Sequence, residues 1–304
     1  MSRPALFTAL ALLTFVGAAD AWGQQPSAPP PVSVTTVGAN LNITPKRVTF
    51  DPQRRTASVY IFNQGTAAAT FDIAMVDRAM LPDGQIVAVA DTAERPEAKA
   101  VADKVASAKD MLLVSPRRAT LAPGQGQTIR LRVASVPQDA KGEYRTHLTV
   151  TTIPPPSVGT TAEDVAGGAG NELRFQITSV FGLSIPAIVR VSEPDVRAAI
   201  EDAHIEYVDL SSDGRSDPKR TPVMAFDLVR VGANSLFGNV EVRAAGKRGD
   251  PIGVARGVGV YTEIDRRSMR VPLTRAPAAG EKLEVTFTDD DTSPGKLLAT
   301  VQAP

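Results

Sequence analysis

Short runs in which apolar and polar residues alternate recur along most of the chain. In Ile129–Val133 (IRLRV) the apolar residues are separated by arginines, and Phe71, Ile73 and Met75 follow the same rule. Successive side chains of a β-strand point to opposite faces, so this period of two predicts strands with one buried face. We therefore expect an all-β protein.

Turn-forming residues separate these runs. Asn63-Gln64-Gly65 and Pro123-Gly124 each supply a residue that tolerates a positive φ or a proline with a preset φ. About seven runs up to Pro186 predict an immunoglobulin-like β-sandwich, and a second series follows it. We expect an N-terminal domain at residues 41–190 and a C-terminal β-sandwich at residues 191–304.

The N-terminus has the pattern of an export signal. Arg3 precedes the apolar stretch Ala5–Val16, and Ala19-Asp20-Ala21 fits the small-x-small rule of a cleavage site. A membrane anchor would need about twenty apolar residues, which this stretch does not reach. We expect a cleaved signal peptide at residues 1–23, a flexible tail rich in Pro and Gln at residues 24–40, and no membrane insertion.

The composition excludes several function classes. The 33 basic and 33 acidic residues cancel, which argues against nucleic acid as a partner. There is no cysteine, so disulfides and thiolate chemistry are excluded, and His147 and His204 have no nucleophile or acid at motif spacing. Asp289-Asp290-Asp291 is consecutive and indicates a solvated hairpin turn, not a calcium loop. We expect no catalytic residue, metal or cofactor.

Two further segments depart from the simple strand rhythm. Residues 93–109 are rich in Ala, Lys and Glu, and because alanine buries little area they predict a surface excursion, either a short helix or a mobile insertion. In Glu172–Pro186, Leu173, Phe175 and Ile177 alternate with polar residues after the Gly-rich loop 154–171. At a sheet edge this row could pair with a strand of another chain, whereas the alternative is that it fills the domain's own core.

Several motifs of the first domain match one known family. The matching segments are Ile43–Phe50 (ITPKRVTF), Ser58–Asn63 (SVYIFN), Val114–Arg118 (VSPRR), Leu121–Gly124 (LAPG), Gln127–Leu131 (QTIRL), Glu143-Tyr144-Arg145 and Ile153-Pro154-Pro155. With them the chain resembles the periplasmic chaperones that assemble pili and fimbriae in the chaperone–usher pathway. The second domain matches only loosely.

The resemblance implies a fold and a function. The family has two immunoglobulin-like domains in an L-shaped arrangement, and its seventh strand complements a pilin-like subunit that lacks a strand. Leu173, Phe175 and Ile177 match these donor residues by position. The chain would then act in the periplasm and deliver subunits to an outer-membrane usher. Whether the free protein caps its own edge in a homodimer stays open.

The resemblance also implies two charged sites. Arg47 matches a basic residue that holds the subunit's C-terminal carboxylate, a contact that a guanidinium suits well, and the alternative is a solvated arginine at a strand end. The family's second basic residue aligns with Gly182. Either another cation such as Lys46 or Arg190 takes its place, or the carboxylate anchor is weaker or absent and the client is atypical. Glu143 matches a position of an interdomain charge cluster, and Arg190 is the candidate partner although it is four residues from the aligned position.

A different class of function remains possible on the same fold. A secreted structural or adhesive protein with two immunoglobulin-like domains would keep its strand edge covered and bind no subunit, because a sandwich fold does not by itself imply a function.

Overall fold

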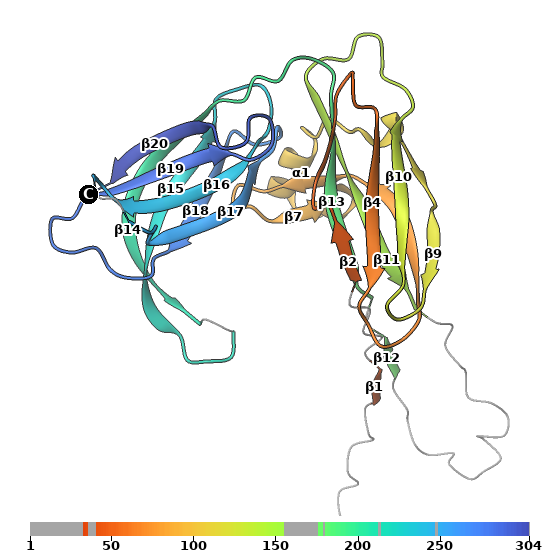
Figure 1. Ribbon diagram of the computed structural model, residues 1–304, viewed down its shortest axis with the longest axis horizontal. Coiled ribbons are helices and arrows are strands. Elements are labelled where there is room, and N and C mark those ends of the chain that lie inside the picture. Colours follow the sequence, from red (N-terminus) through yellow and green to blue (C-terminus); the bar gives the residue numbers. More distant parts are fainter. Residues whose placement is uncertain are drawn as a thin grey trace, which may run out of the picture. The chain divides into compact units, whose positions relative to one another are not determined.

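The computed structural model describes residues 33–35, 41–154, 176–178, 180–211, 214–246 and 249–303 (Figure 1). The chain divides into two units, Met1–Val34 with Val158–Ile177 and Thr35–Ser157 with Thr178–Pro304. The second unit holds both sandwiches described below. Among the described residues, no helix combines the length and the apolar character needed to cross a membrane.

Two sheets form the first sandwich. One has the order β2 (Leu41–Thr44), β4 (Thr56–Asn63), β10 (Gly126–Val133) and β8 (Leu112–Ser115). The other has the order β3 (Val48–Phe50), β13 (Gly182–Arg190), β11 (Glu143–Ile153), β5 (Ala69–Val76) and β9 (Arg118–Leu121). These orders correspond to the ABED and GFC sheets of an immunoglobulin domain.

The alternating pattern of the sequence becomes the core of this sandwich. In β10, Ile129, Leu131 and Val133 are buried, whereas Arg130 and Arg132 between them are exposed. The side chains of the two inner faces meet in one apolar cluster that includes Phe50, Phe71, Ile61, Ile73 and Leu148. The period of two therefore sets which face of each strand is buried.

A second sandwich follows. Its sheets have the orders β14 (Ala198–Leu210), β15 (Lys219–Arg230), β18 (Arg266–Pro272), and β17 (Gly253–Val260), β16 (Leu236–Ala244), β19 (Leu283–Asp289), β20 (Leu297–Ala303). Its core includes Leu228, Val242, Val271, Val285 and Phe287. The prediction of an all-β fold with two immunoglobulin-like sandwiches is confirmed.

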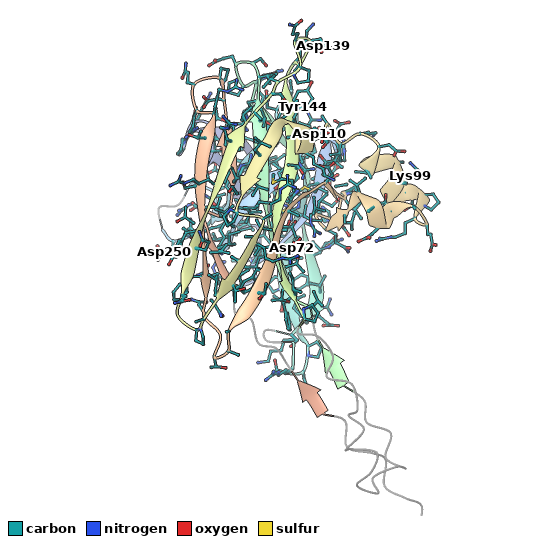
Figure 2. The ribbon with its side chains drawn as sticks, turned by 90° about the vertical axis from the view of Figure 1, so that its right-hand side faces the viewer. Asp72, Lys99, Asp110, Asp139, Tyr144 and Asp250 are labelled. Carbon is teal, nitrogen blue, oxygen red and sulfur yellow. The ribbon has the colours of Figure 1, made fainter. Side chains whose placement is uncertain are left out.

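An insertion between β5 and β8 contains β6 (Arg78–Met80), β7 (Ile86–Ala88), the 3-10 turns η1 (Val89–Thr92) and η2 (Lys109–Met111), and the helix α1 (Pro96–Ala102). Lys99 lies on its solvent side (Figure 2). In residues 93–109 the expected short helix forms and most residues are exposed, but Ala98, Ala102 and Ala108 are buried, so the expectation of a surface excursion is wrong for these three. Ala108 is buried in the first core, Met80 is buried in the second core and Val101 packs against that core. A small side chain here permits close packing.

The expected tail is not without structure. Within residues 24–40, β1 (Ser33–Thr35) forms a two-stranded sheet with β12 (Gln176–Thr178). The rest of the tail, the expected signal peptide at residues 1–23, and residues 155–175, which include most of the loop 154–171, lie outside the described residues.

Candidate functional site: an open strand edge and a buried charge cluster

One side of β13 is only half covered by a neighbouring strand. β13 pairs with β11 over its whole length, from Gly182 opposite Thr151 to Arg190 opposite Glu143. On its other side, β3 pairs only with Ala187–Val189. In the described part of the chain, residues 182–186 therefore have no strand on this second side. Backbone groups at such an edge can pair with a strand of another chain.

The apolar row on β13 begins in the core and runs out of it. Ile185 is buried and Leu183 packs against the first core, but Phe181 is 44% exposed. Phe181 lies at the end of β11, where its N–H donates to Thr152 Oγ1 at 2.9 Å and its carbonyl accepts from the Thr152 N–H at 2.8 Å. In the sequence, every second residue counted back from Phe181 leads to Ile177.

The structure places the three expected donor residues as follows. Leu173 and Phe175 lie outside the described residues, and Ile177 is the middle residue of β12, whose backbone pairs with β1. The exposed Val180 and Phe181 follow Ile177 closely along the chain. Sequence reasoning did not single out these two residues, although Phe181 continues the same alternation.

Glu143 and Arg190 are brought together at the far end of β13. They are cross-strand neighbours, and Arg190 Nε donates to Glu143 Oε2 at 2.9 Å. Arg190 Nη2 also donates to Asp291 Oδ2 at 2.8 Å, and Nη1 donates to Thr292 Oγ1 at 3.0 Å. Asp291 and Thr292 follow β19, so this cluster joins the first sandwich to the second.

Arg47 belongs to the same cluster. Its Nη2 donates to Asp291 Oδ2 at 3.0 Å, and its guanidinium lies 4.7 Å from the centre of the Phe237 ring. The side chain is only 8% exposed, so the alternative of a solvated strand-end arginine is wrong. Lys46 does not enter the cluster; it is exposed and donates to Asn42 Oδ1 at 3.1 Å.

The opposite charges of this cluster stabilise the ionised forms of Arg190 and Asp291. Burial opposes the charge of Arg190, but the attraction of Glu143 and Asp291 outweighs it and raises the pKa of Arg190. Burial would likewise raise the pKa of Asp291, but Arg47 and Arg190 outweigh this effect and hold the pKa below its ordinary value. Asp291 is therefore ionised at neutral pH.

Asp291 was missed at the level of sequence. The acidic run was expected to be a solvated turn, but Asp289 is buried and accepts hydrogen bonds from the backbone N–H groups of Asp291 and Ser293. Only Asp290 of the three is exposed. The run of three acids does not reveal which of them meets an arginine more than 240 residues away.

A second buried ion pair was also missed. Arg145 of β11 contacts Glu263, and the two side chains are 2% and 1% exposed. The guanidinium of Arg145 lies 3.9 Å from the centre of the Tyr261 ring, and Glu263 Oε1 accepts the Met80 N–H at 2.7 Å. These contacts join β11, the insertion and the second sandwich.

The histidines take no part in an acid–base pair with a nucleophile. His147 is buried beside Arg145, and desolvation, followed by repulsion from Arg145 and other arginines, lowers its pKa to about 2. His204 is exposed and bonds Glu206 Oε1 and the Asp202 carbonyl. Among the described residues, no group of three or more His, Cys, Asp or Glu is placed to hold a metal.

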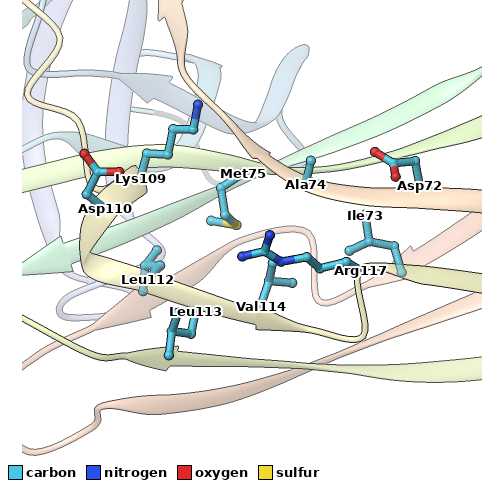
Figure 3. A pocket seen from close by; sticks show the side chains of 10 residues that line it. All are labelled: Asp72, Ile73, Ala74, Met75, Lys109, Asp110, Leu112, Leu113, Val114 and Arg117. Carbon is cyan, nitrogen blue, oxygen red and sulfur yellow. The ribbon is translucent and has the colours of Figure 1, made fainter.

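Two cavities border the first sandwich, one between β5 and β8 and one beside the charge cluster. A groove of 520 Å³ between β5 and β8 has an apolar floor that includes Ile73 and Met75, with Asp72, Lys109 and Arg117 among the charged residues around it (Figure 3). A cavity of 470 Å³ beside the charge cluster is lined by Thr49, Asp51, Pro52, Gln53, Arg54, Arg190, Val191, Ser192, Glu193, Pro194, Asp291 and Thr292.

No family model and no curated protein matches the chain. It is, however, similar to solved structures of chaperones. The E. coli chaperone DraB is 12% identical, with a TM-score of 0.42 over 90% of this chain and 99% of DraB. The CsuC–CsuE chaperone–tip adhesion subunit complex from archaic chaperone–usher Csu pili of Acinetobacter baumannii gives 12% identity and a TM-score of 0.40, covering 87% of this chain and 98% of that one.

The Salmonella enterica SafB chaperone, solved in complex with SafA pilin, gives 11% identity and a TM-score of 0.41 over 89% of this chain and 99% of that one. Similarity at this level assigns no role to a single residue, so the roles proposed below depend on the geometry of this chain.

Gly182, which the motifs align with the family's second basic residue, lies opposite Thr151 at the start of β13, whereas Arg190 lies opposite Glu143 at the other end of the strand.

Proposed function

We propose that this protein is a periplasmic chaperone that binds pilin-like subunits by lending them a strand and delivers them to an outer-membrane usher. The observation that carries the proposal is the half-covered β13. Residues 182–186 have no strand on their second side within the described chain, and the apolar row on this strand continues past the end of its own core at Phe181.

Strand lending suits this arrangement physically. A subunit that lacks a strand exposes an apolar groove and unpaired backbone groups, and both are satisfied when an extended segment with alternating apolar side chains enters the groove. Leu173, Phe175 and Ile177 supply such a row. Phe181 lies at the end of β11, and in the sequence the row directly precedes it.

The charge cluster supplies a candidate anchor for the subunit's C-terminal carboxylate. Arg47 is held by Asp291 and by the ring of Phe237, so its guanidinium is oriented before a subunit arrives. A fixed guanidinium binds a carboxylate at a smaller entropic cost than a mobile one. The protein would use this contact and the lent strand without a catalytic cycle or a cofactor.

The compartment follows from the N-terminal segment. Residues 1–23 would direct export and be removed, which leaves the folded chain in the periplasm. The chain has no cysteine. In that compartment its stability would then depend on core packing and on buried ion pairs, without a disulfide.

The test compares two pairs of substitutions on the same segment. Phe175→Asp with Ile177→Asp places charges on the row proposed to enter the subunit, and Gln176→Asp with Thr178→Asp places the same charges on the alternate positions. Each variant and the wild type are purified from the periplasm, and bound partners are weighed by intact mass spectrometry. Circular dichroism verifies that each variant is folded.

We expect a small partner in equimolar amount with the wild type, retained by the control pair and lost from the Phe175/Ile177 pair. Loss of folding in the Phe175/Ile177 pair would mean that the row belongs to the protein's own core. Absence of a partner from the wild type, or equal recovery with both pairs, would also contradict strand lending and favour a structural two-domain protein.

A further inference from the structure

We propose that Asp291 occupies, in the free protein, the place beside Arg47 that the terminal carboxylate of a subunit takes on binding, so that Asp291 is displaced when the subunit is anchored. The inference rests on the proposed function and names a regulating residue of the same site.

Two of the three guanidinium nitrogens of Arg47 have no acceptor in the described chain. Only Nη2 has partners, Asp291 Oδ2 at 3.0 Å and Ser235 Oγ at 3.4 Å. Within the described chain, Nε and Nη1 are buried and have no hydrogen-bond partner. A buried guanidinium with unused donors is unfavourable, and a carboxylate is the acceptor that fits its planar geometry best.

Asp291 lies between Arg47 and the adjacent cavity. The cavity of 470 Å³ is lined by Thr49, Arg190, Asp291 and Thr292, among others, but Arg47 is not part of its wall. A carboxylate that enters the cavity therefore meets the ionised Asp291 before it can reach Arg47. Two carboxylates at one guanidinium repel each other, so binding at Arg47 requires that Asp291 moves away.

Exchange also explains why the anchor can be buried before a subunit binds. A lone guanidinium in this position would be strongly destabilising because burial removes its water. Asp291 neutralises it in the free protein, and the subunit's carboxylate would do so in the complex. Arg47 therefore faces one carboxylate both in the free protein and in the complex, and binding removes no further water from Arg47.

The rest of the cluster can remain in place while Asp291 moves. Arg190 keeps its contact with Glu143, which is fully buried and lies 2.9 Å from Arg190 Nε. It also keeps the hydrogen bond to Thr292. Asp291, in contrast, is the most exposed of the ion-paired side chains in the cluster, at 14%. It is therefore the member that can be replaced at the smallest structural cost.

The test uses Asp291→Asn, which keeps the size of the side chain and removes its charge, with Asp290→Asn as the matched control on the exposed neighbour. The probe is the pilin-like subunit recovered in the preceding experiment, prepared with a free C-terminal carboxylate and with a C-terminal amide. Dissociation constants of both forms are measured by calorimetry for the wild type and for each variant.

We expect Asp291→Asn to raise the preference for the free carboxylate over the amide about tenfold, which corresponds to the loss of one competing contact, and Asp290→Asn to leave the preference unchanged. If Asp291→Asn does not fold, Asp291→Ser is measured in the same way. An unchanged preference would overturn the inference, even with strand lending intact. Failure of both probe forms to bind the wild type would overturn the proposed function and the inference together.

Discussion

Replacing Glu263 by glutamine should destabilise the protein strongly, because it leaves Arg145 charged and buried. The two side chains are 1% and 2% exposed and contact each other directly. Glutamine keeps the acceptor oxygen for the Met80 N–H, which Glu263 Oε1 binds at 2.7 Å. The substitution therefore removes the charge and little else.

The magnitude follows from what Arg145 retains. Removing one partner of a buried ion pair costs about 3–5 kcal/mol. Arg145 keeps the hydrogen bond from Nη2 to the Arg78 carbonyl at 2.9 Å and its position over the Tyr261 ring. A desolvated cation–π contact compensates by up to about 2 kcal/mol, so we expect a loss near the lower end, about 3 kcal/mol.

The assay is urea-induced unfolding followed by circular dichroism, with two comparisons. Asp103→Asn breaks the exposed Lys99–Asp103 pair on α1, whose side chains are 53% and 61% exposed, and should cost less than about 0.5 kcal/mol. The double variant Arg145→Met with Glu263→Gln removes both charges and should recover about 2 kcal/mol of the loss.

One result would refute this reasoning. If Glu263→Gln costs no more than Asp103→Asn, the pair between Arg145 and Glu263 is solvated in solution, and the contacts between the insertion, β11 and the second sandwich do not form as described. A double variant as unstable as the single variant would show instead that lost packing, and not an unpaired charge, causes the effect.

Three further substitutions test other parts of the structure. Burial lowers the pKa of His147 from 6.5 to about 2, so below pH 6.5 the unfolded chain binds more protons than the folded protein. The free energy of unfolding therefore decreases as the pH is lowered. The wild type should lose about 2 kcal/mol more than His147→Gln between pH 7 and pH 5, measured by urea unfolding, and equal slopes would contradict this. Met80→Ala should cost about 2–5 kcal/mol, whereas Ile86→Ala, at the exposed position opposite Met80 in the same hairpin, should cost less than about 0.5 kcal/mol. Similar losses would show that Met80 does not fill the second core. A Cβ on Gly238 would collide with the Thr288 carbonyl, so Gly238→Ala should lower stability by about 1–3 kcal/mol, while Gly249→Ala meets nothing and should be neutral by thermal unfolding.

The strands could be predicted from the sequence because their signal is local. A buried face at every second residue, as at Ile129, Leu131 and Val133, depends only on neighbours along the chain. The buried alanines of the insertion were missed for the opposite reason. Alanines bury little area, so Ala98 and Ala108 gave no apolar signal, and their burial depends on surfaces that distant parts of the chain supply.

The charge cluster, too, was found only in part from the sequence. The resemblance to a family singled out Arg47, Glu143 and Arg190, and the structure places all three in one network. Asp291, the residue that connects two of them, was not found, because a carboxylate in a run of three has no local property that marks it as buried. Such pairings become visible only when the fold brings the second sandwich to the first.

The open edge and the charge cluster lie at opposite ends of β13, and this separation has a physical consequence. A strand that is to be lent needs backbone groups that stay unpaired, yet an isolated strand would be mobile and would lose much entropy on binding. In β13, residues 182–186 have one free side in the described chain, whereas Arg190 is fixed by Glu143 and Asp291. The fixed end sets the direction of the free end. Because β11 pairs along the whole strand, the edge can remain open towards a partner without fraying from its own sheet.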